Sequence, residues 1–359
     1  MTLRKIGKSE LEIPAIVLGG MFRDPSSRTA ELERALDCAL DVGLFAIDTA
    51  PLYEFGESES LLGRFLKGRR ARTCLMTKVG LRWDDDWGEI LFAAHHSGRP
   101  IVVRRDSRPE AVRRDVEESL VRLRTESLDL VQVHHRDPGT PIDETMGALT
   151  RLRSEGKLRA IGVSNFTPAE LIEAQLALGE LPLASTQNDF SLIERSAENE
   201  LLPTARKIGA SLLAYSPLAQ GILAGRLLGG DLPADDGRMG NPLYQSRNAR
   251  RINHVLRSVV APLAESHEAG LAEVALGWII AQPGVCAAIV GAQTEAQVRT
   301  AAAAAKIELS AAEVDQLGRA FMELPLDRSA GISFQRRFLN RARRLARRVL
   351  RGSDRSSGT

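Results

Sequence analysis

The 359-residue chain is 43% hydrophobic and 26% charged, a composition typical of a globular protein. Its formal charge is +2, but residues 333–359 hold nine Arg against one Asp, a net +8 that leaves −6 for residues 1–332. An acidic body of this kind does not indicate nucleic-acid binding.

Neither a membrane span nor a secretion signal is predicted. The charged start, Met1–Gly7, is not followed by an apolar stretch, and no run of about 18 apolar residues occurs in the chain. The cysteines Cys38, Cys74 and Cys286 stand far apart without metal-ligand spacing, which favours a reducing compartment without disulfides or zinc. We therefore expect a cytoplasmic protein.

Short apolar runs alternate with longer amphipathic segments along the chain. The runs predicted as strands are Ala15–Leu18, Leu44–Asp48, Cys74–Lys78, Leu128–His134, Ala160–Val163, Ala184–Gln187, Leu212–Tyr215 and Val285–Val290. The segments predicted as helices are 28–42, 57–68, 108–123, 141–155, 167–178, 197–208, 244–269 and 294–305. Eight alternating units predict an α/β fold with parallel strands, and their number favours a closed (β/α)8 TIM barrel over an open sheet.

Three segments lie outside this alternation. Leu3–Ile13 predicts an N-terminal β-hairpin, and Leu271–Ala281 and Ala311–Phe321 predict two extra helices. We expect one barrel domain over residues 1–325 and a basic C-terminal tail, partly helical or disordered, over residues 326–359.

An open dinucleotide-binding sheet is the structural alternative. It would need a G-x-G-x-x-G sequence between the first strand and the first helix. The first strand ends instead in Leu18-Gly19-Gly20-Met21, which lacks that spacing. A nicotinamide cofactor, if the protein uses one, must be held in another way.

Polar residues stand at the C-terminal ends of the second, third and fourth predicted strands. They are Asp48, Lys78 and His134, and Tyr53 follows just beyond Asp48. Reacting groups lie at this end of a (β/α)8 barrel. A carboxylate or an ammonium buried alone is costly, so we expect Asp48 and Lys78 to pair. Each residue alone could be structural, but their coincidence at three strand ends favours a site.

Together these four residues have the parts of a proton donor. A free tyrosine titrates near about 10. A neighbouring ammonium would lower the pKa of Tyr53 by stabilising the phenolate, and a carboxylate would hold that ammonium in place. A histidine could orient a carbonyl oxygen, so that the phenol protonates the alkoxide formed by hydride transfer. The adjacent His135 is expected to point the other way along the strand and to be structural.

Four segments carry a pattern that is specific in its order and spacing. They are Asp48-Thr49-Ala50-Pro51-Leu52-Tyr53, Thr77-Lys78-Val79-Gly80, Leu128-Asp129-Leu130-Val131-Gln132-Val133-His134, and Gly156-Lys157-Leu158-Arg159-Ala160-Ile161-Gly162-Val163-Ser164-Asn165-Phe166. From about residue 2 to about residue 305 the chain resembles the aldo-keto reductase family. The resemblance implies NADP(H)-dependent reduction of an aldehyde or ketone, or the reverse, without a metal. It also implies that Asp48, Tyr53, Lys78 and His134 are catalytic.

The same resemblance places a cofactor at the ends of the later strands. It implies that Tyr215 stacks on the nicotinamide ring. It assigns the carboxamide to Ser164, Asn165 and Gln187, the pyrophosphate to Ser216, Leu218 and Gln220, and the adenosine end to Gly291, Gln293, Thr294, Gln297 and Arg299. A 2′-phosphate suits the helix N-terminus there, although Thr294 could equally be a plain helix cap.

Three positions depart from the family pattern. Gln293 stands where a basic residue is usual, and Ala301 stands near the place of an adenine-binding Asn. Both departures weaken the expected preference for NADPH over NADH, although Arg299 could partly compensate. NAD(H) is therefore kept as an alternative cofactor. Glu54 replaces the usual glycine after the tyrosine, which affects the expected loop geometry more than the chemistry.

Two segments have no assigned chemistry. The insertion Leu81–Arg105 carries Trp83, an Asp run and the pair His95-His96; it predicts either a substrate-mouth loop for a polyhydroxylated or cationic carbonyl compound or a plain solvated loop. The histidine pair lacks further ligands at metal-type spacing. The tail carries an apolar stripe flanked by arginines, which suits an anionic membrane surface, a protein partner or a solubilising extension.

Two functions are therefore considered. The first is a carbonyl reductase or alcohol dehydrogenase acting on a small-molecule substrate. The second is a low-activity cofactor-binding sensor or scaffold, tethered through the basic tail. The four strand-end residues favour the first, because a pure binding module has no need of a polarised tyrosine.

Overall fold

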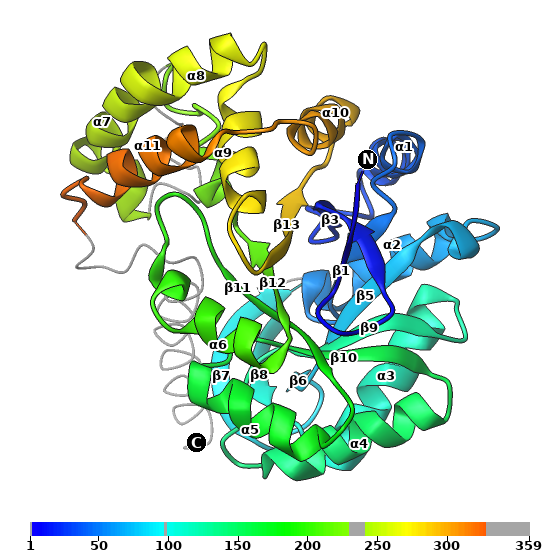
Figure 1. Cartoon of the computed structure of the whole chain (residues 1–359). Helices are drawn as coiled ribbons and strands as arrows, with labels where there is room; N and C mark the ends of the chain where they lie inside the picture. The colour runs from blue at the N-terminus through cyan, green and yellow to red at the C-terminus, as the bar shows by residue number, and fades with distance from the viewer. Residues whose placement is uncertain (1, 97–98, 230–240, 328–359) are drawn as a thin grey trace, which may run out of the picture.

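The computed structural model describes residues 2–96, 99–229 and 241–327 (Figure 1). Eight parallel strands form a closed barrel, which confirms the predicted fold. They are β3 (Ile16–Gly19), β4 (Ala46–Asp48), β5 (Cys74–Val79), β9 (Leu128–Val133), β10 (Leu158–Ser164), β11 (Leu183–Asp189), β12 (Ser211–Tyr215) and β13 (Val285–Gly291). The ring closes between β13 and β3, where Ala288 pairs with Ile16.

In the part of the chain that the structure describes, eight helices surround the barrel. They are α1 (Thr29–Asp41), α2 (Glu57–Phe65), α3 (Pro109–Leu123), α4 (Ile142–Ser154), α5 (Pro168–Leu178), α6 (Leu201–Ile208), α9 (Leu271–Ile280) and α10 (Glu295–Ala304). Short turns of 3₁₀ helix are η1 (Tyr53–Gly56), η2 (Arg70–Arg72), η3 (Ser196–Glu198), η4 (Ala219–Gly221) and η5 (Pro242–Tyr244). The sequence signals for several of these helices are visible in the structure. In α5, for example, Thr167 and Glu170 form a reciprocal capping box around Pro168.

The helix that covers the barrel between β12 and β13 is not the one expected. The sequence assigned that place to 244–269, but these residues form α7 (Ser246–Val255), the π-helical turn η6 (Leu256–Val260) and α8 (Ala261–Ser266), which gather with α11 (Ala311–Met322) outside the barrel wall (Figure 1). Helix α9 packs on β13 instead. It lies between the barrel and this outer group, which explains why it is buried from Val274 through Ile280.

The N-terminal hairpin closes one end of the barrel. Strands β1 (Leu3–Lys5) and β2 (Glu12–Pro14) pair antiparallel, as predicted. Their connection places Ile6 and Leu11 against the apolar interior side chains of the barrel strands. The backbone N–H of Gly7 donates to Ser211 Oγ at the start of β12 (2.9 Å). The N-terminal end of the barrel is thus filled by apolar side chains, and Asp48 and Lys78 lie toward the C-terminal ends of their strands.

The insertion between β5 and α3 is a sheet, not a loop. Strands β6 (Leu81–Arg82), β7 (Glu89–His96) and β8 (Arg99–Arg105) form it in the order β6-β8-β7. Its apolar side chains form a small separate core onto which Leu52 and Phe55 pack. The Asp run is paired rather than simply solvated: Asp84 binds Arg82, and Asp85 binds Arg114 at 2.8 Å. The insertion is therefore an ordered wall beside the loop that carries Tyr53.

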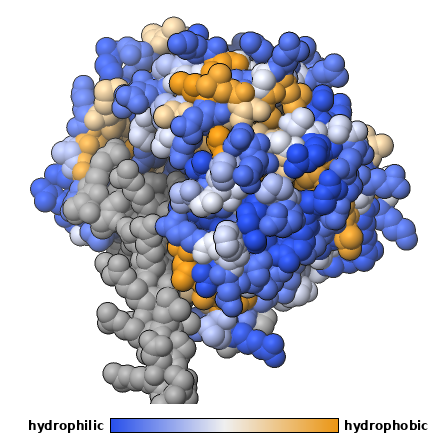
Figure 2. Space-filling model, turned by 90° about the horizontal axis from the view of Figure 1, so that it is seen from below, coloured by the Kyte–Doolittle hydropathy of each residue, from blue (hydrophilic) through white to orange (hydrophobic). Residues whose placement is uncertain are grey.

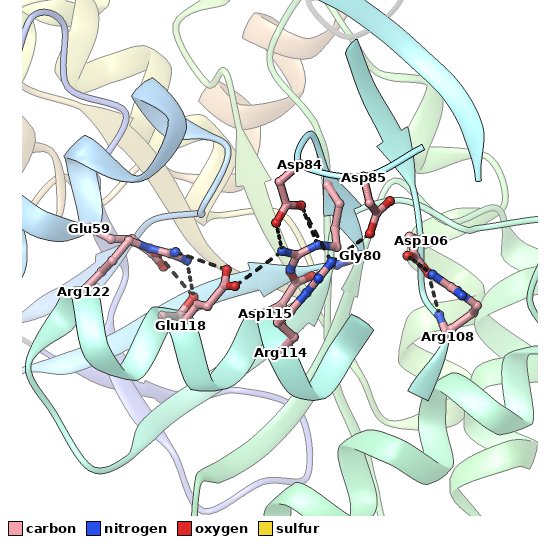
Figure 3. A network of polar contacts seen from close by, with 12 residues as sticks. Glu59, Gly80, Asp84, Asp85, Asp106, Arg108, Arg114, Asp115, Glu118 and Arg122 are labelled. Atoms are coloured by element: carbon pink, nitrogen blue, oxygen red, sulfur yellow. Dashed lines mark hydrogen bonds and ion pairs between the residues drawn. The ribbon is translucent and has the colours of Figure 1, made fainter. Parts of the chain in front are cut away.

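An ionic network fixes this sheet to helix α3 (Figure 3). Asp115 accepts a hydrogen bond from the backbone N–H of Gly80 (2.7 Å) and pairs with Arg82. Both partners of that ion pair are buried, with side chains 4% exposed. Arg82 also contacts Asp84 at 2.5 Å and Glu118 at 3.4 Å. A buried ion pair of this kind is costly to break from one side only.

Replacing Asp115 by alanine is expected to destabilise the fold by about 3 kcal/mol, because the guanidinium of Arg82 stays buried with only the half-exposed Asp84 and Glu118 as charged partners. Urea unfolding measures the loss. The matched control is Asp315→Ala, whose partner Arg319 forms a well-exposed pair at 2.7 Å; that change should cost less than about 1 kcal/mol. Equal losses in the two variants would contradict the anchoring role of Asp115.

The described surface is polar, with dispersed apolar side chains. On the face drawn in Figure 2, apolar residues appear as separate groups among polar ones. The large apolar side chains with the greatest exposure are Val121 on α3 and Leu176 on α5, as is usual for a globular protein. In the described ranges, no helix has both the length and the apolarity to cross a bilayer. The arginine-rich tail lies outside the described residues.

Candidate active site

Lys78 is the centre of the polar end of the barrel. Its Nζ donates to Asp48 Oδ2 (2.6 Å), to the carbonyl of Thr49 (3.0 Å) and to Tyr53 Oη (3.0 Å). The ammonium has three N–H groups, so all of its donors are used. Because Tyr53 Oη accepts from Lys78, its own O–H is free to donate to another group. The structure thus brings together three of the four residues predicted as catalytic.

The strand register explains this arrangement. Asp48 ends β4, and its neighbour on β5 is Met76. Lys78 lies two residues further along β5 and therefore points to the same face as Met76, into the barrel. Both charged side chains are almost fully buried, with exposures of 2% and 1%. The expected pairing of Asp48 with Lys78 is therefore present.

The loop that presents Tyr53 has an unusual backbone. Glu54 and Phe55 both adopt left-handed conformations, with φ of 47° and 50°. Such a conformation costs a non-glycine residue about 1–2 kcal/mol. Glu54 therefore carries a backbone cost that a glycine at this position would avoid. The ring of Phe55 packs on Trp83 and His96 of the inserted sheet, with centroid distances of 5.4 and 4.8 Å. These contacts hold the loop in its strained form.

His134 completes the group. Its ring meets that of Tyr53 edge to face, with centroids 6.2 Å apart. The expectation that His135 points the other way is wrong: its ring stacks on His134 at 5.4 Å. Strand β9 ends at Val133, so strand alternation no longer applies to the two histidines. Burial lowers the pKa of His134 well below its usual range, and it lowers the pKa of His135 to about 3.

The electrostatics of Tyr53 differ from the prediction. Burial raises the pKa of the phenol, and this effect outweighs the opposing field of the Lys78 ammonium, which Asp48 partly cancels. The pKa of Lys78 is also raised: burial alone would lower it, but Asp48 and Tyr53 together favour the charged form. The pocket therefore holds a neutral phenol beside a charged ammonium at neutral pH.

Sequence reasoning missed Gln132. Its Nε2 donates to Asp48 Oδ1 (3.1 Å), and Gln187 Nε2 donates to the same oxygen (2.9 Å). Gln132 lies two residues before His134, which places it on the inward face of β9 and could have indicated it. Gly162 makes room for it, because a Cβ there would lie 3.0 Å from Gln132 Cγ and 2.3 Å from Ser185 Oγ. Asp48 is thus held by two amides and one ammonium.

The residues expected at the carboxamide also converge. Asn165, in a left-handed conformation (φ 63°), donates to the carbonyl of His134 (3.0 Å) and accepts from Tyr215 Oη (2.9 Å). Ser164 Oγ donates to the carbonyl of Gln187 (2.9 Å). The predicted carboxamide contacts and Tyr215 therefore lie next to His134. The amide of Gln187 itself is turned toward Asp48.

The loop after β12 turns through several left-handed residues. They include Ser216, Ala219 and Gln220, with φ of 53°, 47° and 63°. The side chain of Gln220 accepts a hydrogen bond from Asn241 Nδ2 (3.0 Å), and Leu218 packs against the hydrophobic core. Of the residues expected to line the pyrophosphate, these two therefore have their side chains engaged within the protein.

The segment after β13 leads into α10. Thr294 Oγ1 accepts from the backbone N–H of Gln297 (3.3 Å), and Gln297 Oε1 accepts from that of Gln293 (2.8 Å). Thr294 is therefore the cap of α10. Arg299 is exposed and lies 3.9 Å from Glu295.

The family model described as the aldo/keto reductase family matches residues 15–320. The chain belongs to this family. The aldo-keto reductase YhdN of Bacillus subtilis (strain 168) is 32% identical over 296 residues, covering 82% of this chain and 84% of its own. The NADH-specific methylglyoxal reductase of Escherichia coli (strain K12) is 34% identical over 280 residues, with coverage of 76% and 81%. The glycerol dehydrogenase AKR11B4 from Gluconobacter oxydans superposes with a TM-score of 0.79 at 32% identity, covering 90% of this chain and 96% of that one.

The mouth of this aldo-keto reductase suits a nicotinamide cofactor. Ser164, Asn165 and Gln187 carry hydroxyl and amide groups of the kind with which a carboxamide pairs, and in this structure those groups bond to one another, to Asp48 and to Tyr215. A Cβ added at Gly291 would meet no atom within 4 Å, so the backbone there is open to a ligand. The left-handed residues 219–221 expose the kind of turning backbone that binds phosphate. Throughout the described ranges, no three His, Cys, Asp or Glu side chains gather as metal ligands would.

Proposed function

We propose that the protein reduces a small aldehyde or ketone to the alcohol, or catalyses the reverse reaction, with Tyr53 as the general acid or base. The observation that carries this proposal is the hydrogen bond from Lys78 Nζ to Tyr53 Oη at the open end of the barrel (3.0 Å). It leaves the phenolic O–H as a donor beside the neutral ring of His134. A proton donor in this position is what a forming alkoxide requires.

Each of the four residues has a distinct task in this proposal. A bound nicotinamide cofactor supplies the hydride. His134, neutral because of its burial, orients the carbonyl oxygen against the Tyr53 O–H. Tyr53 gives its proton to that oxygen, and the Lys78 ammonium stabilises the phenolate left behind. Asp48 keeps Lys78 in place and charged.

For the cofactor we propose NADP(H), with NAD(H) as the alternative. The open backbone at Gly291 and the cap of α10 support binding of the adenosine end. Gln293 argues for the alternative, since it stands where the family usually has a basic residue. The relative from Escherichia coli is named as NADH-specific. For this reason both NADPH and NADH are included in the experiment below.

The substrate proposal is a small carbonyl compound or its alcohol. Two relatives are named for small oxygenated compounds, methylglyoxal and glycerol. The ring of Phe55, in the Tyr53 loop, packs on Trp83 of the insertion, so an aromatic pair lies near the proton donor. An apolar wall next to a polar proton donor suits a short carbonyl compound.

A panel of aldehydes and ketones, each mixed with NADPH or with NADH, tests the function. The loss of absorbance of the reduced cofactor reports turnover and cofactor choice together. The proposal expects turnover of some small carbonyl compounds with at least one cofactor. Tight cofactor binding without turnover across the panel would favour the sensor or scaffold function instead.

The pH dependence of reduction distinguishes the structural view of Tyr53 from the sequence-based one. Because burial raises the pKa of the phenol above its usual value near 10, the donor stays protonated, and we expect the reduction rate to be flat from about pH 6 to about pH 9. The rate then falls as pH rises through the pKa of Tyr53. Single-turnover rates with saturating cofactor measure this. A decline centred between about pH 7 and about pH 9 would show instead that Lys78 lowers the pKa, as the sequence suggested.

A further inference from the structure

Arg28 connects two loops that are far apart in the sequence. It precedes α1, yet its Nη1 donates to Oε1 of Gln293, which precedes α10, at 2.5 Å. Its Nε donates to Glu31 Oε2 (2.9 Å), and its Nη2 lies at the same distance from that oxygen. The side chain is about one-third exposed. The guanidinium therefore lies against the residue that takes the place of a basic side chain in the proposed cofactor site.

Other charges surround this contact because α1 and α10 pack side by side (Figure 1). Arg34 of α1 and Arg299 of α10 both lie 3.9 Å from Glu295. Both of these arginines are well exposed and loosely paired, whereas Arg28 is better covered and makes short contacts. Of these three arginines, Arg28 is thus the one with the closest contacts and the least exposed side chain.

A phosphate oxygen could replace the amide oxygen of Gln293 as the acceptor of the Arg28 hydrogen bond. Nη1 of Arg28 donates to a neutral amide oxygen, which is a weaker acceptor than a phosphate oxygen of charge between about −1.5 and −2. A planar guanidinium also matches phosphate geometry with two parallel donors. A phosphate ester placed at Gln293 could take over the Nη1 donor, while Glu31 keeps Nε and Nη2 and limits the gain.

We propose that Arg28 is a specificity-determining residue that selects the 2′-phosphate of NADP(H), and that Glu31 moderates this selection. The inference rests on the proposed function, because it requires that a nicotinamide cofactor binds at the β13–α10 end. It assigns the missing basic group to the loop before α1. In this proposal the positive charge that is missing at Gln293 is supplied by Arg28.

Cofactor binding to the full chain tests the proposal without turnover. NADPH and NADH are titrated separately while tryptophan fluorescence is followed, and the ratio of the two Kd values is compared among variants. Arg28→Ala should weaken NADPH about tenfold, equivalent to one charge-assisted hydrogen bond, and leave NADH almost unchanged. Glu31→Gln should shift the ratio further toward NADPH. These opposite shifts are not expected from a general loss of structure.

Arg69→Ala is the matched control. Arg69 also pairs with a carboxylate of α1, Asp37, at 3.1 Å and with similar exposure, but it extends from the segment after α2 on the side of α1 away from α10. It should leave both Kd values unchanged. If the wild type binds both cofactors and Arg28→Ala does not change their ratio, the role of Arg28 is refuted while the proposed function stands. If the wild type binds neither cofactor, both proposals fail.

Discussion

Replacing Tyr53 by phenylalanine is expected to lower kcat for carbonyl reduction about a thousandfold, while the Kd of the reduced cofactor stays within about twofold of the wild-type value. The change removes one oxygen atom, and with it the only group in the proposal that can protonate the alkoxide. The ring and its edge-to-face contact with His134 remain. Lys78 loses one of three acceptors but keeps Asp48 and the carbonyl of Thr49.

The third tyrosine provides a control of the same chemistry. Tyr244→Phe removes a hydroxyl that donates to the carbonyl of Gln220 (2.8 Å), whereas the hydroxyl of Tyr53 accepts from Lys78. We expect less than a tenfold change in kcat for this variant. Stopped-flow measurement of the hydride-transfer step separates chemistry from product release in both. Retention of more than a tenth of the activity in Tyr53→Phe would show that another group protonates the substrate.

Replacing Lys78 by methionine is expected to abolish activity and to destabilise the protein by about 3–5 kcal/mol, because the carboxylate of Asp48 stays buried without its ammonium. Methionine retains most of the side-chain volume, so a cavity is not the main cause. Gln132 and Gln187 still donate to Asp48 Oδ1, but Oδ2 loses its partner. Urea unfolding measures the loss of stability.

A double-mutant cycle with Asp48→Asn separates charge from packing. Asparagine removes the uncompensated charge, so Asp48→Asn combined with Lys78→Met should recover at least about 1 kcal/mol relative to Lys78→Met alone. Activity should not return, because Tyr53 then lacks its ammonium. Additive losses in the double variant would contradict the view that this pair is one electrostatic unit.

The local pattern of apolar and polar residues was sufficient to predict much of the fold and to place Asp48, Tyr53, Lys78 and His134 near the C-terminal ends of the strands. A buried strand such as β5 is a mainly apolar run with a charge at Lys78, next to its last residue Val79, and both features are visible in the sequence. The sequence does not reveal which helix covers the barrel before β13. The stretch 244–269 has the same amphipathic spacing of apolar residues as a barrel helix, although it packs outside the barrel wall. Only the packing partners of α9 decide between them.

Other features depend on distances that no local pattern contains. The contact of Arg28 with Gln293 spans 265 residues. The direction of the pKa shift of Tyr53 depends on how far burial outweighs a nearby ammonium, and burial is a property of the folded chain. The inserted strands β7 and β8 alternate too weakly to be recognised, and their role as support for Phe55 follows only from ring contacts.

The position of these residues along the barrel has a consequence for how the enzyme could be altered. Asp48, Tyr53, Lys78 and His134 all come from the first four barrel strands and their loops, whereas the proposed nicotinamide contacts begin at Ser164 and come from the last four. In this proposal the proton-transfer residues and the nicotinamide contacts come from separate halves of the polypeptide, whereas Arg28, proposed to select the 2′-phosphate, belongs to the first half. Gln187 joins the halves through its hydrogen bond to Asp48. An exchange of the second half with that of a relative would therefore replace the nicotinamide contacts and keep both the proton donor and Arg28, provided that this amide is retained.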